Sequence, residues 1–121
     1  MGQQSPSLDE LAGVPLLANL PHDSLARLAE GMERREPEPG EVVLREGDQG
    51  DRFYVVLSGT LSVRRHDVGQ RRVLMPGEYF GEVALVEDDR RTATVSPLGA
   101  SAVASCDEAA FAELVRPLFW A

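Results

Sequence analysis

The sequence predicts a mainly β fold: an eight-stranded jelly-roll β-barrel with helices at its N-terminal end and one helix at its C-terminal end. Short segments rich in β-branched and aromatic residues recur between positions 33 and 105, and glycine turns separate them. Helical spacing of apolar residues occurs only before and after this region. A chain of 121 residues is near the usual size of one domain. We therefore expect one domain over residues 8–121, preceded by a flexible tail over residues 1–7.

The N-terminal helical pattern extends from Ser7 to Met32. Pro21 can open a second helical segment, because proline is tolerated in the first turn of a helix. In this second segment the apolar residues recur at spacings of three and four, which gives one apolar stripe. The stripe consists of Leu25, Leu28, Ala29 and Met32.

The central region predicts short strands. Glu33 to Glu38 is polar and ends near a proline, which is typical of an edge strand. The other predicted strands are Val42 to Leu44, Phe53 to Leu57, Leu61 to Arg65, Arg71 to Leu74, Thr92 to Ser96 and Ala102 to Ser105.

Glycine marks the turns between these strands. Pro39-Gly40 and Pro76-Gly77 suit the central positions of type II turns, since proline fixes φ and glycine accepts a positive φ. Ser58-Gly59 and Asp67 to Gln70 indicate hairpins.

The C-terminal helix is predicted from Asp107, whose side chain can cap the first amides. Phe111, Leu114 and Val115 form its inner face, and Pro117 prevents a smooth continuation.

The net charge of the chain excludes some classes of binding partner. Twelve arginines, no lysine and twenty acidic residues give a net charge of −8. Such a field repels nucleic acid, so direct nucleic-acid binding is not expected. No apolar run approaches the length of a membrane span, and residues 1–10 lack the pattern of a signal peptide.

The chemistry-bearing side chains do not indicate an enzyme. His22 and His66 are too few for a jelly-roll metal centre, and no nucleophilic or paired-carboxylate arrangement is evident. Cys106 is the only cysteine, so no disulfide can form within the chain, and a reducing, cytoplasmic location is expected. Its small apolar neighbours predict that Cys106 is buried as a small hydrophobic residue.

Residues 80–94 are the most informative part of the sequence. They combine a glycine turn, a short apolar helix, an acidic connection and an arginine that precedes a strand. Backbone N–H groups at a helix start can bind an anion, and Arg91 can add a planar charged fork for phosphate oxygens. Glu82 can accept a hydrogen bond from a sugar hydroxyl. The segment therefore predicts a pocket for a small phosphorylated sugar.

This segment resembles the phosphate-binding cassette of the cyclic-nucleotide-binding domain family. The positions that match in register are Phe80, Gly81, Glu82, Ala84, Leu85, Arg91, Ala93 and Thr94. Further matches follow the family order at Pro39-Gly40-Glu41, Glu46 to Asp51, Phe53 to Gly59 and Pro76 to Tyr79. The resemblance covers about Pro15 to Val115.

The resemblance implies a role for each ligand-binding residue. Gly81 and the amides of Val83 and Ala84 would cradle the cyclic phosphate, Arg91 would neutralise it, and Glu82 would accept a hydrogen bond from the ribose 2′-hydroxyl. The alternative for Glu82 is a surface carboxylate in a weak ion pair. The family has proline where Arg90 stands, so the connection before Arg91 is looser here.

The sequence leaves the roles of Thr92, Phe119, Trp120 and Leu85 open. Thr92 can reach the phosphate or a guanine amino group, or it can simply favour a strand, so the ligand is cyclic AMP or cyclic GMP. Phe119 or Trp120 can cover the base, although terminal aromatic residues more often fill a nearby groove. Leu85 is a candidate for the apolar contact through which the family moves its C-terminal helix.

The function implied by the resemblance is cyclic nucleotide binding by a regulatory or sensor domain. Ligand occupancy would be coupled to movement of the C-terminal helix or to a partner protein, and a homodimer is an option. The alternative is a nucleotide-free jelly-roll scaffold or protein-docking module. Phosphodiesterase activity is a third hypothesis, which the absence of catalytic motifs disfavours.

Overall fold

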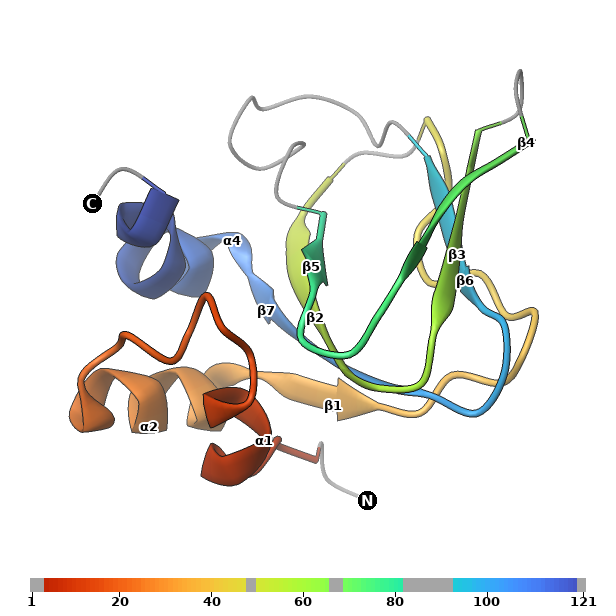
Figure 1. The fold of residues 1–121 in the computed structure, drawn as a ribbon. Coiled ribbons are helices and arrows are strands. Elements are labelled where there is room, and N and C mark those ends of the chain that lie inside the picture. The colour runs from red at the N-terminus through yellow and green to blue at the C-terminus, as the bar shows by residue number, and fades with distance from the viewer. Residues whose placement is uncertain (1–3, 48–49, 66–68, 82–92, 120–121) are drawn as a thin grey trace.

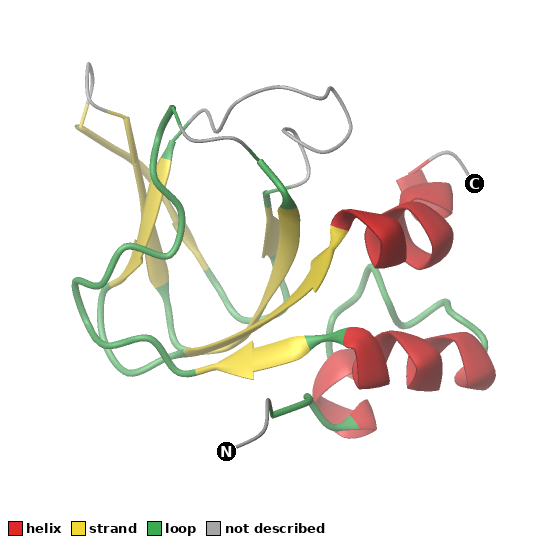
Figure 2. Ribbon diagram, turned by 180° about the vertical axis from the view of Figure 1, so that it is seen from behind, coloured by secondary structure: helices red, strands yellow, loops and turns green. Residues whose placement is uncertain are grey.

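The computed structural model describes residues 4–47, 50–65, 69–81 and 93–119. Helical elements lie on one side of the molecule and two antiparallel β-sheets lie on the other (Figures 1 and 2). This arrangement confirms the prediction of a mainly β fold with flanking helices. The helical elements of the described residues are α1 (Leu8–Ala12), α2 (His22–Gly31), α4 (Glu108–Ala110), the π-helical segment η1 (Phe111–Val115) and the 3₁₀ segment η2 (Arg116–Phe119).

The starts of α1 and α4 are fixed by side-chain caps. Ser7 Oγ accepts a hydrogen bond from the Glu10 amide at 3.0 Å, and the Glu10 carboxylate accepts one from the Ser7 amide at 3.0 Å. Asp107 accepts a hydrogen bond from the Ala110 amide at 2.9 Å, which confirms the predicted cap of the C-terminal helix. The predicted helical stretch from Ser7 to Met32 is divided into α1 and α2, and the second helix begins immediately after Pro21 as expected.

The strands of the described residues form two sheets. In chain order they are β1 (Glu33–Arg35), β2 (Arg52–Ser58), β3 (Leu61–Arg65), β4 (Gly69–Leu74), β5 (Tyr79–Phe80), β6 (Thr94–Pro97) and β7 (Ala102–Asp107). One sheet has the order β1-β7-β2-β5 and the other the order β4-β3-β6. All pairs are antiparallel.

The predicted strand Val42 to Leu44 is corrected by the structure. Within the described residues this segment makes only an isolated bridge, between Leu44 and Val95. The segment follows the Pro39-Gly40 turn directly, and its ladder with β6 does not extend beyond that bridge.

The Ser58-Gly59 hairpin prediction is also wrong. β2 and β3 belong to different sheets, so the turn is a corner through which the chain passes from one sheet to the other. A Cβ atom added to Gly59 would lie 2.4 Å from the Ala100 carbonyl oxygen, which explains why glycine is required at this close approach. The local turn signal was correct, but the pairing of the strands around it is a long-range property.

The two Pro-Gly turns are confirmed. The Glu41 amide donates to the Glu38 carbonyl at 2.9 Å, and the Glu78 amide donates to the Met75 carbonyl at 3.0 Å. Gly40 and Gly77 have φ angles of 84° and 92°.

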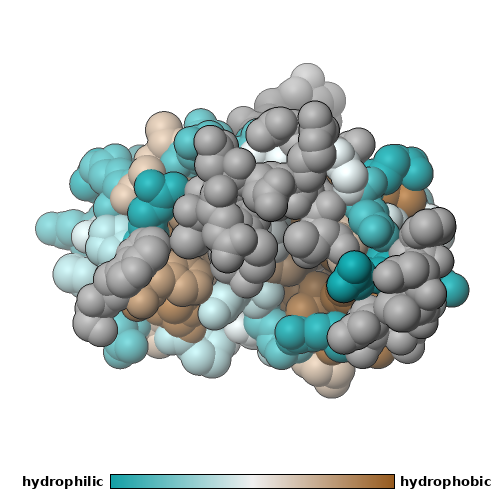
Figure 3. All heavy atoms as spheres, turned by 90° about the horizontal axis from the view of Figure 1, so that it is seen from above, coloured by the Kyte–Doolittle hydropathy of each residue, from teal (hydrophilic) through white to brown (hydrophobic). Residues whose placement is uncertain are grey.

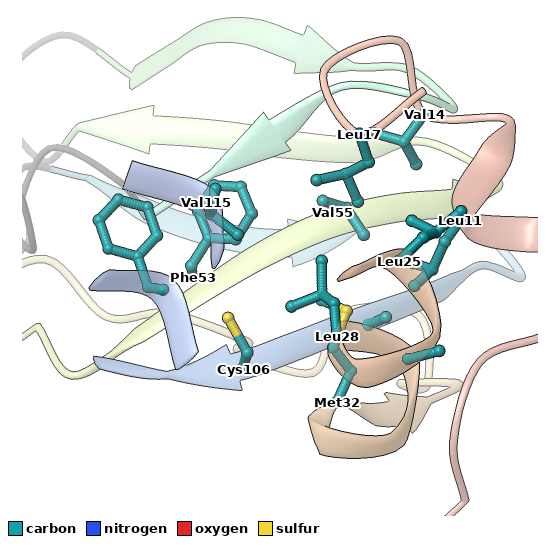
Figure 4. Packing of buried hydrophobic residues seen from close by; sticks show 13 residues of the cluster. Leu11, Val14, Leu17, Leu25, Leu28, Met32, Phe53, Val55, Cys106 and Val115 are labelled. Carbon is teal, nitrogen blue, oxygen red and sulfur yellow. The ribbon is translucent and has the colours of Figure 1, made fainter. Parts of the chain in front are cut away.

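The alternation of β2 divides the core into two clusters. Phe53 and Val55 face the helices, whereas Tyr54 and Val56 face the second sheet. Figure 4 shows the first cluster, in which Phe53, Val55 and Cys106 of the sheet lie beside residues from the helices. The cluster between the sheets consists of Leu44, Tyr54, Val56, Leu61, Leu74, Phe80, Val95 and Val103. β2 is therefore apolar on both faces and links the helical side of the molecule to the space between the sheets.

Candidate functional site

The candidate site is the connection between β5 and β6, because the predicted phosphate-binding segment lies between these strands. Gly81, the first of its predicted ligand-binding residues, directly follows β5 and has a φ angle of 89°. This left-handed conformation is unfavourable for any residue with a Cβ atom, which explains glycine at the position. The predicted residues Glu82, Val83, Ala84, Arg91 and Thr92, together with Leu85, lie outside the described residues.

Phe80 holds the N-terminal end of this segment. Its backbone pairs with Tyr54 of the central strand β2. The two rings stack with centroids 4.9 Å apart and an interplanar angle of 7°. Phe80 is only 6% exposed and belongs to the cluster between the sheets. The stacked pair therefore fixes Gly81 at the margin of that space.

Thr94 holds the C-terminal end. Its backbone pairs with Arg64 of β3, and its hydroxyl oxygen accepts a hydrogen bond from the Glu46 amide at 2.9 Å. Glu46 is distant in sequence and lies just after the Leu44 bridge to Val95. Sequence analysis identified Thr94 as part of the motif but did not identify this bond, because the partner is a backbone amide that carries no sequence signal.

The two ends of the segment belong to different sheets. β5 is the edge strand of the four-stranded sheet and β6 is the edge strand of the three-stranded sheet. Gly81 at the end of β5 and Thr94 at the start of β6 therefore mark the two described ends of the predicted segment, one on each sheet (Figure 1).

The buried hydrophobic residues between the sheets are aliphatic and aromatic. An anion bound against these side chains alone would lose its hydration without gaining hydrogen bonds, so it requires polar partners.

Phe119 is placed against the helical side of β5. Its ring meets the Tyr79 ring edge-on, with centroids 5.5 Å apart and an interplanar angle of 83°. The Phe119 and Phe111 centroids are 6.1 Å apart. These contacts favour the groove-filling interpretation of Phe119 over the base-covering one. Trp120 lies outside the described residues.

Cys106 is fully buried, as predicted. Burial raises the pKa of its thiol to about 12, Arg52 opposes this shift and Asp107 adds to it. The thiol is therefore protonated at neutral pH and does not have the character of a nucleophile.

No three His, Cys, Asp or Glu side chains in residues 4–47, 50–65, 69–81 and 93–119 come together as a metal site. None of the helices in these same ranges has the length and apolar character needed to cross a bilayer.

Comparison with known proteins supports the assignment made from the motif. The family model described as "Cyclic nucleotide-binding domain" matches residues 34–117. The cAMP-dependent protein kinase regulatory subunit of Eremothecium gossypii is 38% identical over 110 residues, which cover 91% of this chain and 24% of that protein. Human cGMP-dependent protein kinase 2 is 39% identical over 90 residues, which cover 70% of this chain and 12% of that protein.

A solved structure described as cAMP-bound PfPKA-R has a TM-score of 0.85 and 25% sequence identity to this chain. The match covers 92% of this chain and 39% of the solved chain. The chain spans about a quarter or less of the length of the two curated relatives. The family match includes the apolar β2, both anchors of the β5–β6 connection, and α4 and η1 of the C-terminal segments. The chain therefore belongs to the cyclic nucleotide-binding domain family.

Proposed function

We propose that the chain is a regulatory domain that binds cyclic AMP or cyclic GMP through residues 81–92 and transmits occupancy to its C-terminal helix or to a partner protein. One observation carries the proposal. Gly81 has a φ angle of 89° at the end of β5. It directly follows Phe80, whose ring stacks on Tyr54, and beyond the other end of the connection the Thr94 hydroxyl accepts a hydrogen bond from the Glu46 amide. A connection fixed at both ends can present its amides to an anion with little loss of entropy on binding.

Arg91 is assigned the phosphate contact. Unit charges about 4 Å apart at an effective dielectric constant near 20 attract each other by roughly 4 kcal/mol. Micromolar affinity requires roughly 8 kcal/mol. One guanidinium–phosphate contact is thus large enough to dominate binding.

Five further residues complete the proposed site. Gly81 and the amides of Val83 and Ala84 surround the phosphate, and Glu82 accepts a hydrogen bond from the ribose hydroxyl. Thr92 reaches the phosphate or the purine amino group. The choice between cyclic AMP and cyclic GMP stays open, since relatives named for each nucleotide resemble the chain at 38% and 39% identity.

The route to the C-terminal helix passes through adjacent residues of β5. Phe80 faces the inter-sheet space, whereas Tyr79 faces the helical side and contacts Phe119. Phe111 and Val115 of η1 are fully buried beside Phe53 of β2. A shift of β5 on ligand binding would therefore alter the packing of the C-terminal segments. The ligand moves this equilibrium only by the difference between its affinities for the two arrangements.

The same proposal covers the extent of the domain, its complete fold, its location and its partners. Residues 8–121 act as one domain after a tail over residues 1–7, and an eighth strand completes a jelly-roll barrel. The domain performs no catalysis and acts in the cytoplasm, which the single buried thiol Cys106 fits. A regulated partner protein or a second copy of the chain receives the signal. Neither nucleic acid nor a membrane is a partner of this chain.

Calorimetric titration of cyclic AMP and cyclic GMP tests the proposal. Wild type, Arg91→Ala and the matched control Arg90→Ala are compared, since the two substitutions remove the same charge from neighbouring positions. We expect Arg91→Ala to weaken binding by at least a hundredfold and Arg90→Ala by less than threefold. Equal cyclic nucleotide affinities in Arg91→Ala and wild type would show that Arg91 does not bind the phosphate.

A thermal melt separates the nucleotide sensor from the scaffold. A ligand at 100 times its dissociation constant stabilises the folded state by about 2.7 kcal/mol. If millimolar cyclic AMP and cyclic GMP both leave the melting temperature unchanged, the chain is a nucleotide-free docking module. Chromatography of the same mixtures reports on catalysis, and the appearance of a 5′-nucleotide would contradict a purely binding function.

A further inference from the structure

An open depression lies over β3 and the start of β6, on the side of the molecule away from the helices. Its volume is about 770 Å³. The residues that line it include Arg45, Glu46, Gly47, Arg64, Arg65 and Thr94. Seen from above, hydrophilic and some hydrophobic side chains are visible on the side formed by the three-stranded sheet, beside residues drawn in grey (Figure 3).

The depression lies on the outer face of the three-stranded sheet. Val63 and Val95 are paired across β3 and β6 and pack against the inter-sheet cluster. Their neighbours Arg64 and Thr94 form the next pair, and alternation directs these two side chains to the opposite face. The depression includes Glu46 and Thr94, whose hydrogen bond holds the C-terminal end of the predicted segment, whereas Arg64 lies on the face of β3 opposite the inter-sheet cluster.

The register in which β3 pairs with β4 changes at this face of the sheet. The pairing of β3 with β4 changes between Val63 and Arg64, which is a β-bulge or similar irregularity. Such irregularities increase the local twist and turn side chains in a new direction. The shift lies next to Arg64, one of the residues that line the depression.

The charge of the depression is opposite to that of the chain. Three guanidinium groups and one carboxylate line it, whereas the whole chain has a net charge of −8. Arg45, Arg64 and Arg65 are all exposed. Within the described part of the chain, the side chains of Arg45 and Arg64 have no hydrogen bond or ion pair to another residue.

The other exposed arginines provide a contrast. Arg27 bonds to Glu113, Arg35 bonds to Glu41, and Arg72 bonds to Glu78 at 3.0 Å. Among the described residues, Arg45 and Arg64 differ from these three arginines, because no carboxylate is paired with their side chains. Surface cations of this kind are available to a carboxylate from another molecule.

We propose that this depression, with Arg45 and Arg64 at its centre, docks an acidic segment of a partner protein. Guanidinium groups bind carboxylates through two parallel hydrogen bonds, and arginine is enriched at protein interfaces. The net negative charge of the rest of the chain repels an acidic segment, whereas the arginines of the depression attract it. This difference in charge determines where the segment binds and in which orientation. This inference does not depend on the proposed nucleotide site.

Other anionic ligands fit the depression less well. Small-molecule sites generally enclose 70–90% of their ligand, and this depression is wide and open, so a small anion would remain largely in water. Nucleic acid and anionic membranes present extended negative charge, which a chain of net charge −8 repels over a broad area. A short acidic peptide is small enough for its carboxylates to contact the arginines of the depression without lying against the negative remainder of the chain.

Fluorescence anisotropy with a labelled ten-residue Glu/Asp peptide tests the proposal. Wild type is compared with Arg45→Ala/Arg64→Ala and with the control Arg27→Ala/Arg72→Ala, which removes the same charge from arginines that already have partners. We expect the first double substitution to weaken peptide binding by at least tenfold and the control to change it by less than twofold. Binding to wild type should also weaken as salt rises from 50 to 300 mM.

Equal binding to both double variants, or no binding to wild type at 50 mM salt, would overturn the proposal. So would displacement of the peptide by inorganic phosphate at an equal charge concentration, or binding to phosphatidylserine vesicles in preference to the peptide. Titration of cyclic AMP into Arg45→Ala/Arg64→Ala keeps the two proposals distinguishable: nucleotide affinity equal to wild type is expected. A large loss of that affinity would place these arginines in the nucleotide site and contradict a separate docking surface.

Discussion

The rings of Tyr79 and Phe119 meet edge-to-face with centroids 5.5 Å apart, and this contact joins the strand that precedes the proposed nucleotide site to the C-terminal segment. The next residue, Phe80, points to the opposite side of the sheet and stacks on Tyr54. Two consecutive residues of β5 therefore contact the two parts of the molecule that a regulatory domain must couple.

The first prediction concerns this contact. Phe119→Ala removes an aromatic pair worth about 0.5–1.5 kcal/mol, so the melting temperature should fall by several degrees. Because Phe119 lies on the helical side of β5, cyclic AMP affinity should change by less than threefold. Trp120 is the only tryptophan and adjoins Phe119, so its fluorescence change on cyclic AMP binding should be smaller in the variant. An undiminished change would show that coupling bypasses this contact.

The second prediction concerns Gly81. Gly81→Ala places a Cβ atom on a residue with a φ angle of 89°, which costs about 1–2 kcal/mol. We expect cyclic AMP affinity to fall at least tenfold by titration calorimetry, because the turn that presents the amides is distorted. Gly31→Ala is the matched control: a Cβ atom there meets nothing within 4 Å, so affinity should not change. Wild-type affinity in Gly81→Ala would mean that this turn is not part of the site.

The third prediction concerns Thr94. Thr94→Val removes the acceptor of the Glu46 amide hydrogen bond, at a cost of about 0.5–1.5 kcal/mol. Thr94→Ser keeps the hydroxyl and should retain most of the stability in urea denaturation. We expect cyclic nucleotide affinity to follow the same order, because Arg91 is attached to the strand that this bond positions. If valine and serine behave alike, the bond does not position the site.

The fourth prediction concerns Cys106 and pH. The pKa of the thiol is raised from 9.0 to about 12 in the folded chain. The unfolded thiol ionises at the lower value, so the stabilising contribution is complete below pH 9 and declines between pH 9 and about 12. The slope for one group is at most about 1.4 kcal/mol per pH unit. Cys106→Ala should have lower stability at pH 7 but a shallower decline above pH 9, measured by denaturation in urea.

An unchanged slope in Cys106→Ala would assign the alkaline loss of stability to other groups. A thiol reagent offers a second measurement at neutral pH. Because Cys106 is fully buried, it should react only at the rate at which the domain opens, and urea should accelerate the reaction.

Local features of the fold were predictable from the sequence. The cap at Asp107 and the turns at Pro39-Gly40 and Pro76-Gly77 depend on residues close in the chain, and all were confirmed. The burial of Cys106 was predicted from its apolar neighbours and is also confirmed. Hairpin pairing between β3 and β4 was predicted correctly from the glycine turn.

Long-range features were less predictable. Ser58-Gly59 resembles a hairpin turn locally, but the two strands beside it pair with β5, β7, β4 and β6 rather than with each other. The register that gives Val42 to Leu44 only one bridge is likewise set by its partner. The bond from the Glu46 amide to Thr94 joins residues 48 positions apart, and no sequence pattern records it.

The sequence by itself determined the family, the residues expected to meet the phosphate and the local turns, because side-chain type and spacing carry that information. Only the tertiary structure decided that Phe80 and Tyr79 face opposite sides of one strand and that Phe119 packs against Tyr79 and Phe111. It also decided that Arg45 and Arg64 border one depression in which, among the described residues, no carboxylate is paired with their side chains. These relationships arise from packing between segments distant in the chain, where sheet order and register, rather than local preference, fix which side chains meet.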